Sequence, residues 1–188
     1  MRSPVSRTSV VFAPEPYTFR DVRGYQKVWS APERKCCGVY LWCIEYRGAY
    51  LVNYVGKTTG KYGFDGRLWK ELKDWRAGLC WRPVDVEAWK VGRRVLLQDA
   101  PPNQLARQLA EFEPLYRILL APITEASDCF RVENEIVHRL RANDAVFQFL
   151  CNGDKDWAKY PHEPTVEISA TGNPPIIGLT APIPQSLL

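Results

Sequence analysis

Two adjacent segments rich in β-branched and aromatic residues constrain the fold of this chain most strongly. They are GVYLWCIEY at residues 38–46 and YLVNYVG at residues 50–56. Residues of these types favour strands, and only RGA at 47–49 separates the two segments. A connection this short joins antiparallel neighbours, so the sequence predicts a β-hairpin.

A helix is expected after the hairpin and its polar, glycine-rich connector. Over 67–78, apolar residues recur at i, i+4 and i+7 from Leu68, which places them on one helical face. Asp65 is suited to cap the start of this helix, and Gly78 is a natural stop.

The second half of the chain contributes one more strand and one more helix. LYRILLAPI at 115–123 predicts the strand, CFRVENEIVHRLRA at 129–142 predicts an amphipathic helix, and 147–152 is a last short apolar segment. Residues 79–113 precede the third strand as an insertion. The order predicts an α+β fold, in which a small antiparallel sheet of about three strands is flanked by helices.

Both ends of the chain have irregular compositions. Residues 161–188 hold six of the fifteen prolines, and 1–35 are similarly interrupted. We therefore expect the folded unit to span 36–160, between an irregular N-terminal arm and a Pro-rich tail that is flexible unless it docks.

Composition excludes several classes of protein. With 46% apolar and 24% charged residues, wholesale disorder is excluded. No run approaches about 18 apolar residues, so we expect no membrane partner and a cytoplasmic location. The six cysteines form no CxxC pair and there are only two histidines, which argues against a zinc site or a disulfide framework.

Five residues whose side chains are suited to catalysis or ligand binding lie in or next to the predicted strands and helices. Tyr40 opens the first strand, Tyr54 closes the second and Lys57 follows it, while Arg67 begins a helix and Glu133 lies in a later one. Taken singly, each is an ordinary strand or helix residue. The set has neither the histidine of an acyl-hydrolase triad nor the glycine spacing of a P-loop.

This ordered set resembles the GIY-YIG nuclease superfamily. The matching motifs are Gly38-Val39-Tyr40, Tyr54-Val55-Gly56 with Lys57, Arg67, and Glu133-x-x-Ile136-Val137. The resemblance covers roughly 38–152. It departs from the family in the spacing of sixty-six positions from Arg67 to Glu133, and in Glu71, which stands where the family often has His or Tyr.

The resemblance implies a DNA endonuclease that uses Mg²⁺ or Mn²⁺. Glu133 would hold the metal, since one carboxylate plus water suits octahedral Mg²⁺. Arg67 would bind the scissile phosphate through its planar guanidinium. We favour Tyr40 as the general base, with Tyr54 orienting water or phosphate, although the two roles are interchangeable from sequence.

Two further positions complete the implied catalytic set. Lys57 is close enough in sequence to Tyr54 to lower the pKa of a tyrosine by its charge. A late asparagine is common in the family, and Asn152 is favoured over Asn143 because it follows an apolar stretch.

The charge distribution agrees with a polyanionic partner, which we expect to be DNA. Residues 54–94 carry ten Lys or Arg against five Asp or Glu, and contacts to phosphate dominate nucleic-acid affinity. Tryptophans of the same stretch, beginning with Trp69 and Trp75, are candidates for stacking on bases. The predicted nucleic-acid-binding residues are Lys57, Lys61, Arg67, Lys70, Lys73 and Arg76.

Several alternatives remain open at this point. The absence of a second recognisable DNA-reading domain favours a restriction-type or mobile-element nuclease. A catalytically inactive nucleic-acid-binding module of the same fold is the main alternative, and an adaptor that docks through its Pro-rich tail is another. Double-strand cleavage by one active site calls for a homodimer or for two successive visits.

Overall fold

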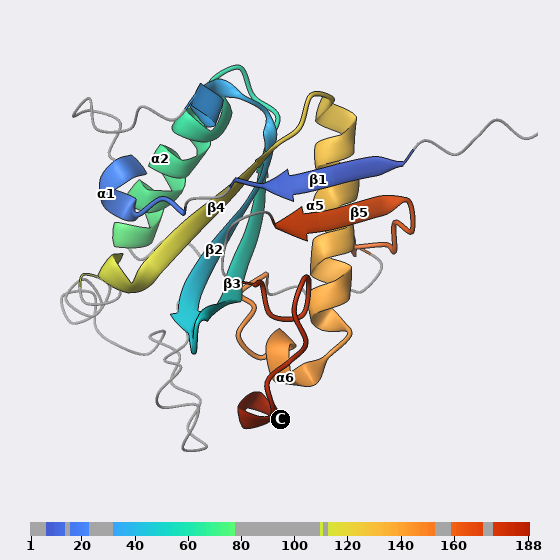
Figure 1. Cartoon of the computed structure of the whole chain (residues 1–188). Coiled ribbons are helices and arrows are strands. Elements are labelled where there is room, and N and C mark those ends of the chain that lie inside the picture. Colours follow the sequence, from blue (N-terminus) through green and yellow to red (C-terminus); the bar gives the residue numbers. More distant parts are fainter. Residues whose placement is uncertain are drawn as a thin grey trace, which may run out of the picture.

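A computed structural model describes residues 7–13, 16–22, 32–77, 110, 113–152, 159–170 and 175–188 of the chain. Its centre is a three-stranded antiparallel sheet of order β3-β2-β4 (Figure 1). Strand β2 (Gly38–Tyr46) lies between β3 (Ala49–Thr58) and β4 (Tyr116–Pro122). The predicted hairpin and third strand are therefore confirmed, and so is the α+β class.

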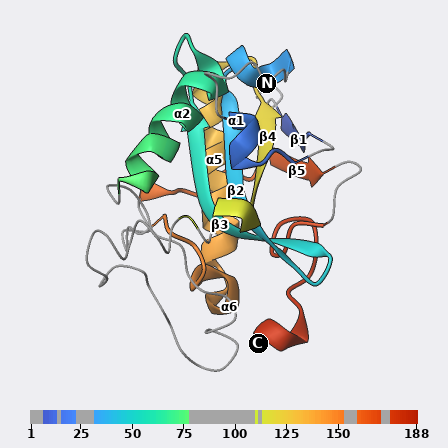
Figure 2. The same cartoon turned by 90° about the vertical axis from the view of Figure 1, so that its left-hand side faces the viewer.

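One long helix covers each face of this sheet. Helix α2 (Gly63–Arg76) and the short α1 (Phe19–Val22) lie on one face, and α5 (Ala126–Arg141) lies on the other. In Figure 2, α2 is in front of the strands and α5 behind them. The insertion expected before β4 falls almost wholly outside the described residues.

Both long helices begin earlier than predicted. Helix α2 starts at Gly63 after Tyr62, which provides no side-chain cap, so Asp65 lies inside the first turn. Helix α5 starts at Ala126, also without a side-chain cap at Glu125. The expected start of α2 relied on a cap by Asp65, which this helix does not use.

The two ends of the chain meet in a second sheet that the sequence did not predict. Strands β1 (Thr8–Phe12) and β5 (Val166–Ala170) pair in parallel beside α5. Val10, Phe12 and Val166 are buried there. The expected arm and tail thus contribute to the core, because a strand of five residues fits between prolines.

The remaining described elements are short. They are η1 (Pro32–Lys35), η3 (Glu113–Leu115), α6 (Asp144–Phe147) and η5 (Gln185–Leu187). The apolar segment predicted at 147–152 follows α6 and runs beside β3. No helix among the described residues is long and apolar enough to cross a membrane.

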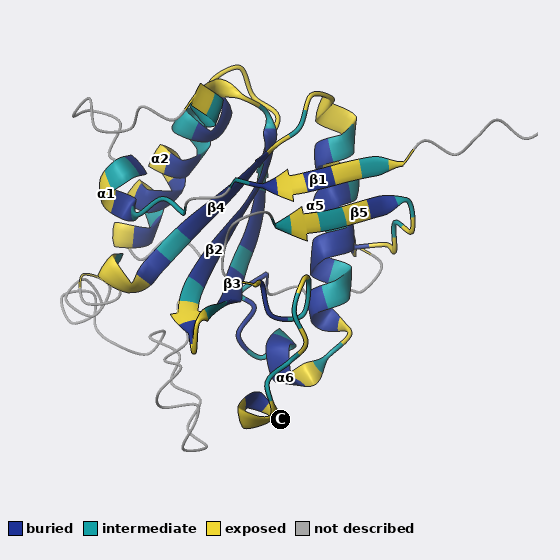
Figure 3. Ribbon diagram, viewed as in Figure 1, coloured by how far each residue is buried: buried dark blue, intermediate teal, exposed yellow. Residues whose placement is uncertain are grey.

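The sheet separates two cores of different composition. The core under α2 is largely aromatic, and its members include Phe19, Tyr40, Trp42, Phe64, Trp75 and Tyr116. The core under α5 is mostly aliphatic and includes Val39, Leu41, Val55, Ile136 and Leu140. Figure 3 shows that β2 is buried over most of its length, as a central strand packed on both faces must be.

Candidate active site

Strand β3 pairs with β2 along one edge only. Its other edge is covered by further segments from Tyr50 to Val55 and is open at Lys57. Backbone hydrogen bonds join Tyr50 to the C-terminal segment 175–177. At Val55 a side chain, that of Asn152, takes the place of a neighbouring strand. Within the described part of the chain, no backbone group of another segment pairs with this edge at Lys57. Side chains from both faces of the sheet can therefore meet a ligand at this end of β3.

The Asn152 carboxamide holds the strand just before the open edge. Its Oδ1 accepts from the N–H of Val55 at 2.8 Å, and its Nδ2 donates to the Val55 carbonyl at 2.7 Å. The guanidinium of Arg141 donates to the Asn152 carbonyl at 2.9 Å. Asn143, the alternative from sequence, instead caps α6 by accepting from the N–H of Ala145 at 3.0 Å. The Asn152 carboxamide thus satisfies a strand edge that would otherwise lack a partner there.

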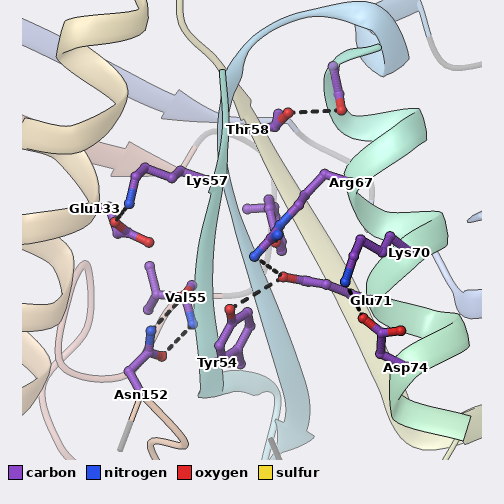
Figure 4. Close-up of polar contacts among 12 residues, drawn as sticks. Tyr54, Val55, Lys57, Thr58, Arg67, Lys70, Glu71, Asp74, Glu133 and Asn152 are labelled. Atoms are coloured by element: carbon purple, nitrogen blue, oxygen red, sulfur yellow. Dashed lines mark hydrogen bonds and ion pairs between the residues drawn. The ribbon is translucent and has the colours of Figure 1, made fainter. Parts of the chain in front are cut away.

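On the α2 face, Arg67 and Glu71 join the two tyrosines of the predicted site, and Figure 4 shows Arg67 and Tyr54 both directed at Glu71. Nε of Arg67 donates to the hydroxyl of Tyr40 at 3.1 Å. Nη2 of Arg67 lies 2.8 Å from Oε1 of Glu71, one turn further along the helix. The Tyr54 hydroxyl donates to the same oxygen at 3.3 Å. Three of the predicted site residues therefore belong to one network.

Glycine at position 56 makes this arrangement possible. Gly56 is the register partner of Tyr40 across the β2–β3 pair. A Cβ atom at this position would lie 2.3 Å from both Cζ and Oη of Tyr40. Only a residue without a side chain lets the ring lie over the strand, which is a physical reason for the last letter of the YVG motif.

Burial shapes the proton affinities of this network. Burial raises the pKa of Tyr40 well above its usual value, and the Glu71 carboxylate raises it further against the opposing charge of Arg67. The pKa of Tyr54 is raised by the same two effects in the same order. Burial also raises the pKa of Glu71, although Arg67 and both hydroxyls oppose the shift. At neutral pH both tyrosines are therefore neutral phenols. The carboxylate of Glu71, whose pKa is raised despite its pairing with Arg67, is the group of this network that can accept a proton.

On the α5 face, Glu133 and Lys57 form an ion pair at the rim of the sheet. Nζ of Lys57 donates to Oε2 of Glu133, and Figure 4 shows this pair across β3 from Arg67. The same Nζ lies 4.4 Å from the centroid of the Phe130 ring. The side chains of Glu133 and Lys57 are 10% and 26% exposed, so water and small ligands reach them.

Glu133 fits a loosely held magnesium ion. The described residues contain no group of three or more His, Cys, Asp or Glu side chains that could hold a metal. Mg²⁺, however, often takes one or two carboxylates and completes its coordination with water and substrate phosphates. Oε2 of Glu133 is paired with Nζ of Lys57, so a metal held by this carboxylate would have to share or displace that contact.

Three of the predicted nucleic-acid-binding cations line a shared cavity of about 350 Å³. These are Lys57, Arg67 and Lys70, and Tyr62 forms part of the same wall. No Asp or Glu is among the described residues that line this cavity. Its lining therefore has the charge that suits a phosphate group, although Lys70 also pairs with Asp74 on the helix surface.

The other three predicted cations lie outside this cavity. Nζ of Lys61 lies 4.8 Å from the centroid of Tyr62, and Nζ of Lys73 lies 5.6 Å from that of Trp69. Arg76 forms two hydrogen bonds with Glu113, which occupy its guanidinium. The structure thus divides the predicted basic surface into a cavity and a periphery.

Glu71 is the site residue that sequence reasoning missed. The departure from the family pattern at this position cast doubt on any role there, yet the side chain contacts both Arg67 and Tyr54. Its spacing of four residues from Arg67 is the signal that could have revealed it, since helical pairs at i and i+4 face each other. Trp75, considered for stacking, is instead buried in the aromatic core.

Comparisons with protein-family models, with curated proteins and with solved structures give no match for this chain. The resemblance to GIY-YIG nucleases therefore rests on the motif residues and on where the fold brings them.

Proposed function

We propose that this protein is a metal-dependent endonuclease of the GIY-YIG type that hydrolyses phosphodiester bonds of DNA. The observation that carries the proposal is the open end of β3, where Arg67 and Lys57 line one cavity and Glu133 pairs with Lys57 across the strand. Phosphodiester hydrolysis needs cationic groups around the phosphate and a group that accepts a proton from water. The residues near this edge supply both.

The phosphate is bound by the cations of the cavity. Arg67, with its planar guanidinium, and Lys70 line the cavity from α2, while Lys57 lines it from β3 with its Nζ paired to Glu133 across the strand. Glu133 would hold the Mg²⁺, which when bound neutralises charge on the phosphate and leaving oxygens. Two cationic side chains near one phosphate stabilise the negative charge that develops as the water oxygen attacks phosphorus.

The proton leaves the attacking water through Tyr54 and Glu71. The Tyr54 hydroxyl takes the proton of the water and passes its own proton to Oε1 of Glu71, to which it is hydrogen-bonded. The water oxygen then bonds to phosphorus, the bond from phosphorus to the leaving oxygen breaks, and the leaving oxygen takes up a proton from solvent water. This route needs no free phenolate, which the raised pKa values of both tyrosines disfavour. It replaces Tyr40, the base favoured from sequence, by Glu71.

Tyr40 and Asn152 have positioning roles in this scheme. The fully buried Tyr40 accepts from Nε of Arg67 and so fixes the direction of the guanidinium. Asn152 fixes β3 through Val55, between the positions of Tyr54 and Lys57.

Plasmid cleavage tests the proposal directly. Purified protein with Mg²⁺ is expected to nick or linearise DNA, and EDTA is expected to stop the reaction. Glu133→Gln should lower the rate by about 10³-fold, because the loss of a metal-holding carboxylate costs several kcal/mol of transition-state stabilisation. Arg67→Lys, which keeps the charge but loses the forked geometry, should lower it less.

The matched control is Glu167→Gln, an exposed glutamate that pairs with Arg7 on the β1–β5 sheet. This variant should cleave at the wild-type rate. Folded wild-type protein that binds DNA but cleaves none, with any metal, would establish the binding-module alternative instead. Equal activity of Glu133→Gln and Glu167→Gln would contradict the assigned metal site.

A further inference from the structure

Two exposed aromatic rings stand on either side of Lys57. Tyr62 is 65% exposed and lines the cationic cavity on the α2 side. Phe130 is 49% exposed and projects from α5, where its ring lies under Nζ of Lys57. Large apolar side chains are usually buried, so two exposed rings beside one phosphate-sized cationic cavity call for an explanation.

Two contacts between a cation and an aromatic ring elsewhere in the described structure involve buried rings. Arg47 lies over Tyr46, and Lys159 over Tyr160, but these rings are only 3% and 9% exposed. Tyr62 also has a cation beside it, since Nζ of Lys61 lies 4.8 Å from its ring centroid, but at 65% exposure much of its surface stays open to a ligand.

We propose that Tyr62 and Phe130 stack against unpaired bases on either side of the phosphate held at Lys57, so that the preferred substrate is a nucleic-acid strand that is single-stranded at the cleavage point. This inference rests on the proposed function, because it defines the substrate of the same site. Base–aromatic stacking accepts any base, since each has a π-face.

The cationic cavity and the two exposed rings together favour single-stranded over double-stranded nucleic acid. In a duplex the base faces are already stacked on one another, and the outer surface offers phosphates to cations but no base face to a ring. The cationic cavity alone would serve either form. The exposed rings add contact area only when the bases beside the phosphate are free.

Binding measured without cleavage separates this inference from the nuclease activity. Fluorescence anisotropy in EDTA would compare a dye-labelled oligonucleotide of mixed sequence with its blunt duplex. We expect tighter binding of the single strand by the wild type. Tyr62→Ala and Phe130→Ala should each weaken it at least about fivefold, the lower end of the stacking range, while duplex binding changes little.

Conservative and matched variants make the test specific to the two rings. Tyr62→Phe and Phe130→Tyr keep a ring and should bind as the wild type does. Leu115→Ala removes another exposed apolar side chain that is not among the residues lining the cavity, and it should leave single-strand binding within twofold. Tighter binding of the duplex, or an equal loss in Leu115→Ala, would overturn the inference.

Cleavage of the same two oligonucleotides in Mg²⁺ then tests the proposed function on its own. Cleavage with tighter duplex binding would overturn the stacking inference and keep the nuclease. Ring-dependent binding of the single strand without any cleavage would overturn the nuclease and keep the stacking contacts.

Discussion

The two faces of the central sheet bury glutamates in opposite ways. Under α2, Glu71 faces two tyrosine hydroxyls and one arginine in an aromatic core, and burial raises its pKa. On the α5 side, burial would also raise the pKa of Glu135, but hydrogen bonds from Arg139, from the N–H of Glu163 and from His162 outweigh it, and the pKa is lowered. Glu71 therefore remains able to accept a proton, whereas Glu135 is held in its ionised form.

The opposite pKa shifts indicate different roles for the two glutamates, one in the stability of the fold and one in the proposed catalytic site. The three partners of Glu135 hold the segment that leads into β5 against α5, so this carboxylate stabilises the fold. The contacts of Glu71 with Arg67 and the two hydroxyls do not outweigh its burial, so its charge costs stability, and it lies among the residues of the candidate site. Three substitutions test this contrast, in order of decreasing effect.

The largest effect is expected for Gly56→Ala. The new Cβ would lie 2.3 Å from the ring of Tyr40, whose surroundings are packed on every side. Either the ring or the strand must move, which costs about 3 kcal/mol of unfolding free energy, the upper end of the range for overpacking. Urea denaturation measures this loss. Gly48→Ala is the control for a generic glycine effect, since nothing lies within 4 Å of its Cβ position, and an equal loss there would contradict the steric reason. Because Gly48 has a φ of +77°, some loss of its own is expected.

Glu135→Gln is expected to cost about 2 kcal/mol at pH 7, the value of a hydrogen bond to a charged group. A lowered pKa means that the unfolded state binds the proton more tightly. The stabilisation by Glu135 is therefore present above the ordinary glutamate pKa of about 4.3 and is lost as the pH falls through the lowered value. The gap between wild type and variant in urea titrations should hold from pH 7 to about pH 5 and shrink as the pH falls below about 4.3. A gap that stays constant would show that the charge of Glu135 is not what stabilises.

Glu71→Gln has the smallest expected effect and the opposite sign with pH. Because its pKa is raised, the folded state binds this proton more tightly, so the contribution of Glu71 is most favourable below the ordinary pKa and is lost as the pH rises through the raised one. Relative to the variant, the wild type should lose about 1 kcal/mol or less between pH 4 and pH 7. Thermal unfolding across this range provides the measurement. A wild type that gains stability relative to the variant as the pH rises would contradict the assigned direction.

The sequence predicted the elements that carry their own periodic signal. Strand β2 was expected at 38–46 and found at Gly38–Tyr46, because a run of β-branched and aromatic residues is bounded by glycine and a turn. Arg67 and Glu133 were placed on helices, and α2 and α5 carry them. These signals are local, so a single sequence is enough to read them.

What the sequence did not reveal depends on partners far away in the chain. The β1–β5 pair joins residues such as Val10 and Ile168, and neither strand has a pattern that names its partner. The same holds for Asn152, whose carboxamide acts on the backbone of Val55. Glu71 was missed for a different reason, since the family pattern directed attention to His or Tyr at its position.

The pairing of β1 with β5 has a consequence for the order of folding during synthesis. The strands of the central sheet and α2 are complete once residue 122 has been made, whereas β1 must wait for β5, which ends at residue 170. On a ribosome that adds about 5–20 residues per second, that interval is several seconds. During it, the apolar side chains Val10 and Phe12 have no parallel partner strand, so β1 of the nascent chain offers a binding site for chaperones until β5 has been made.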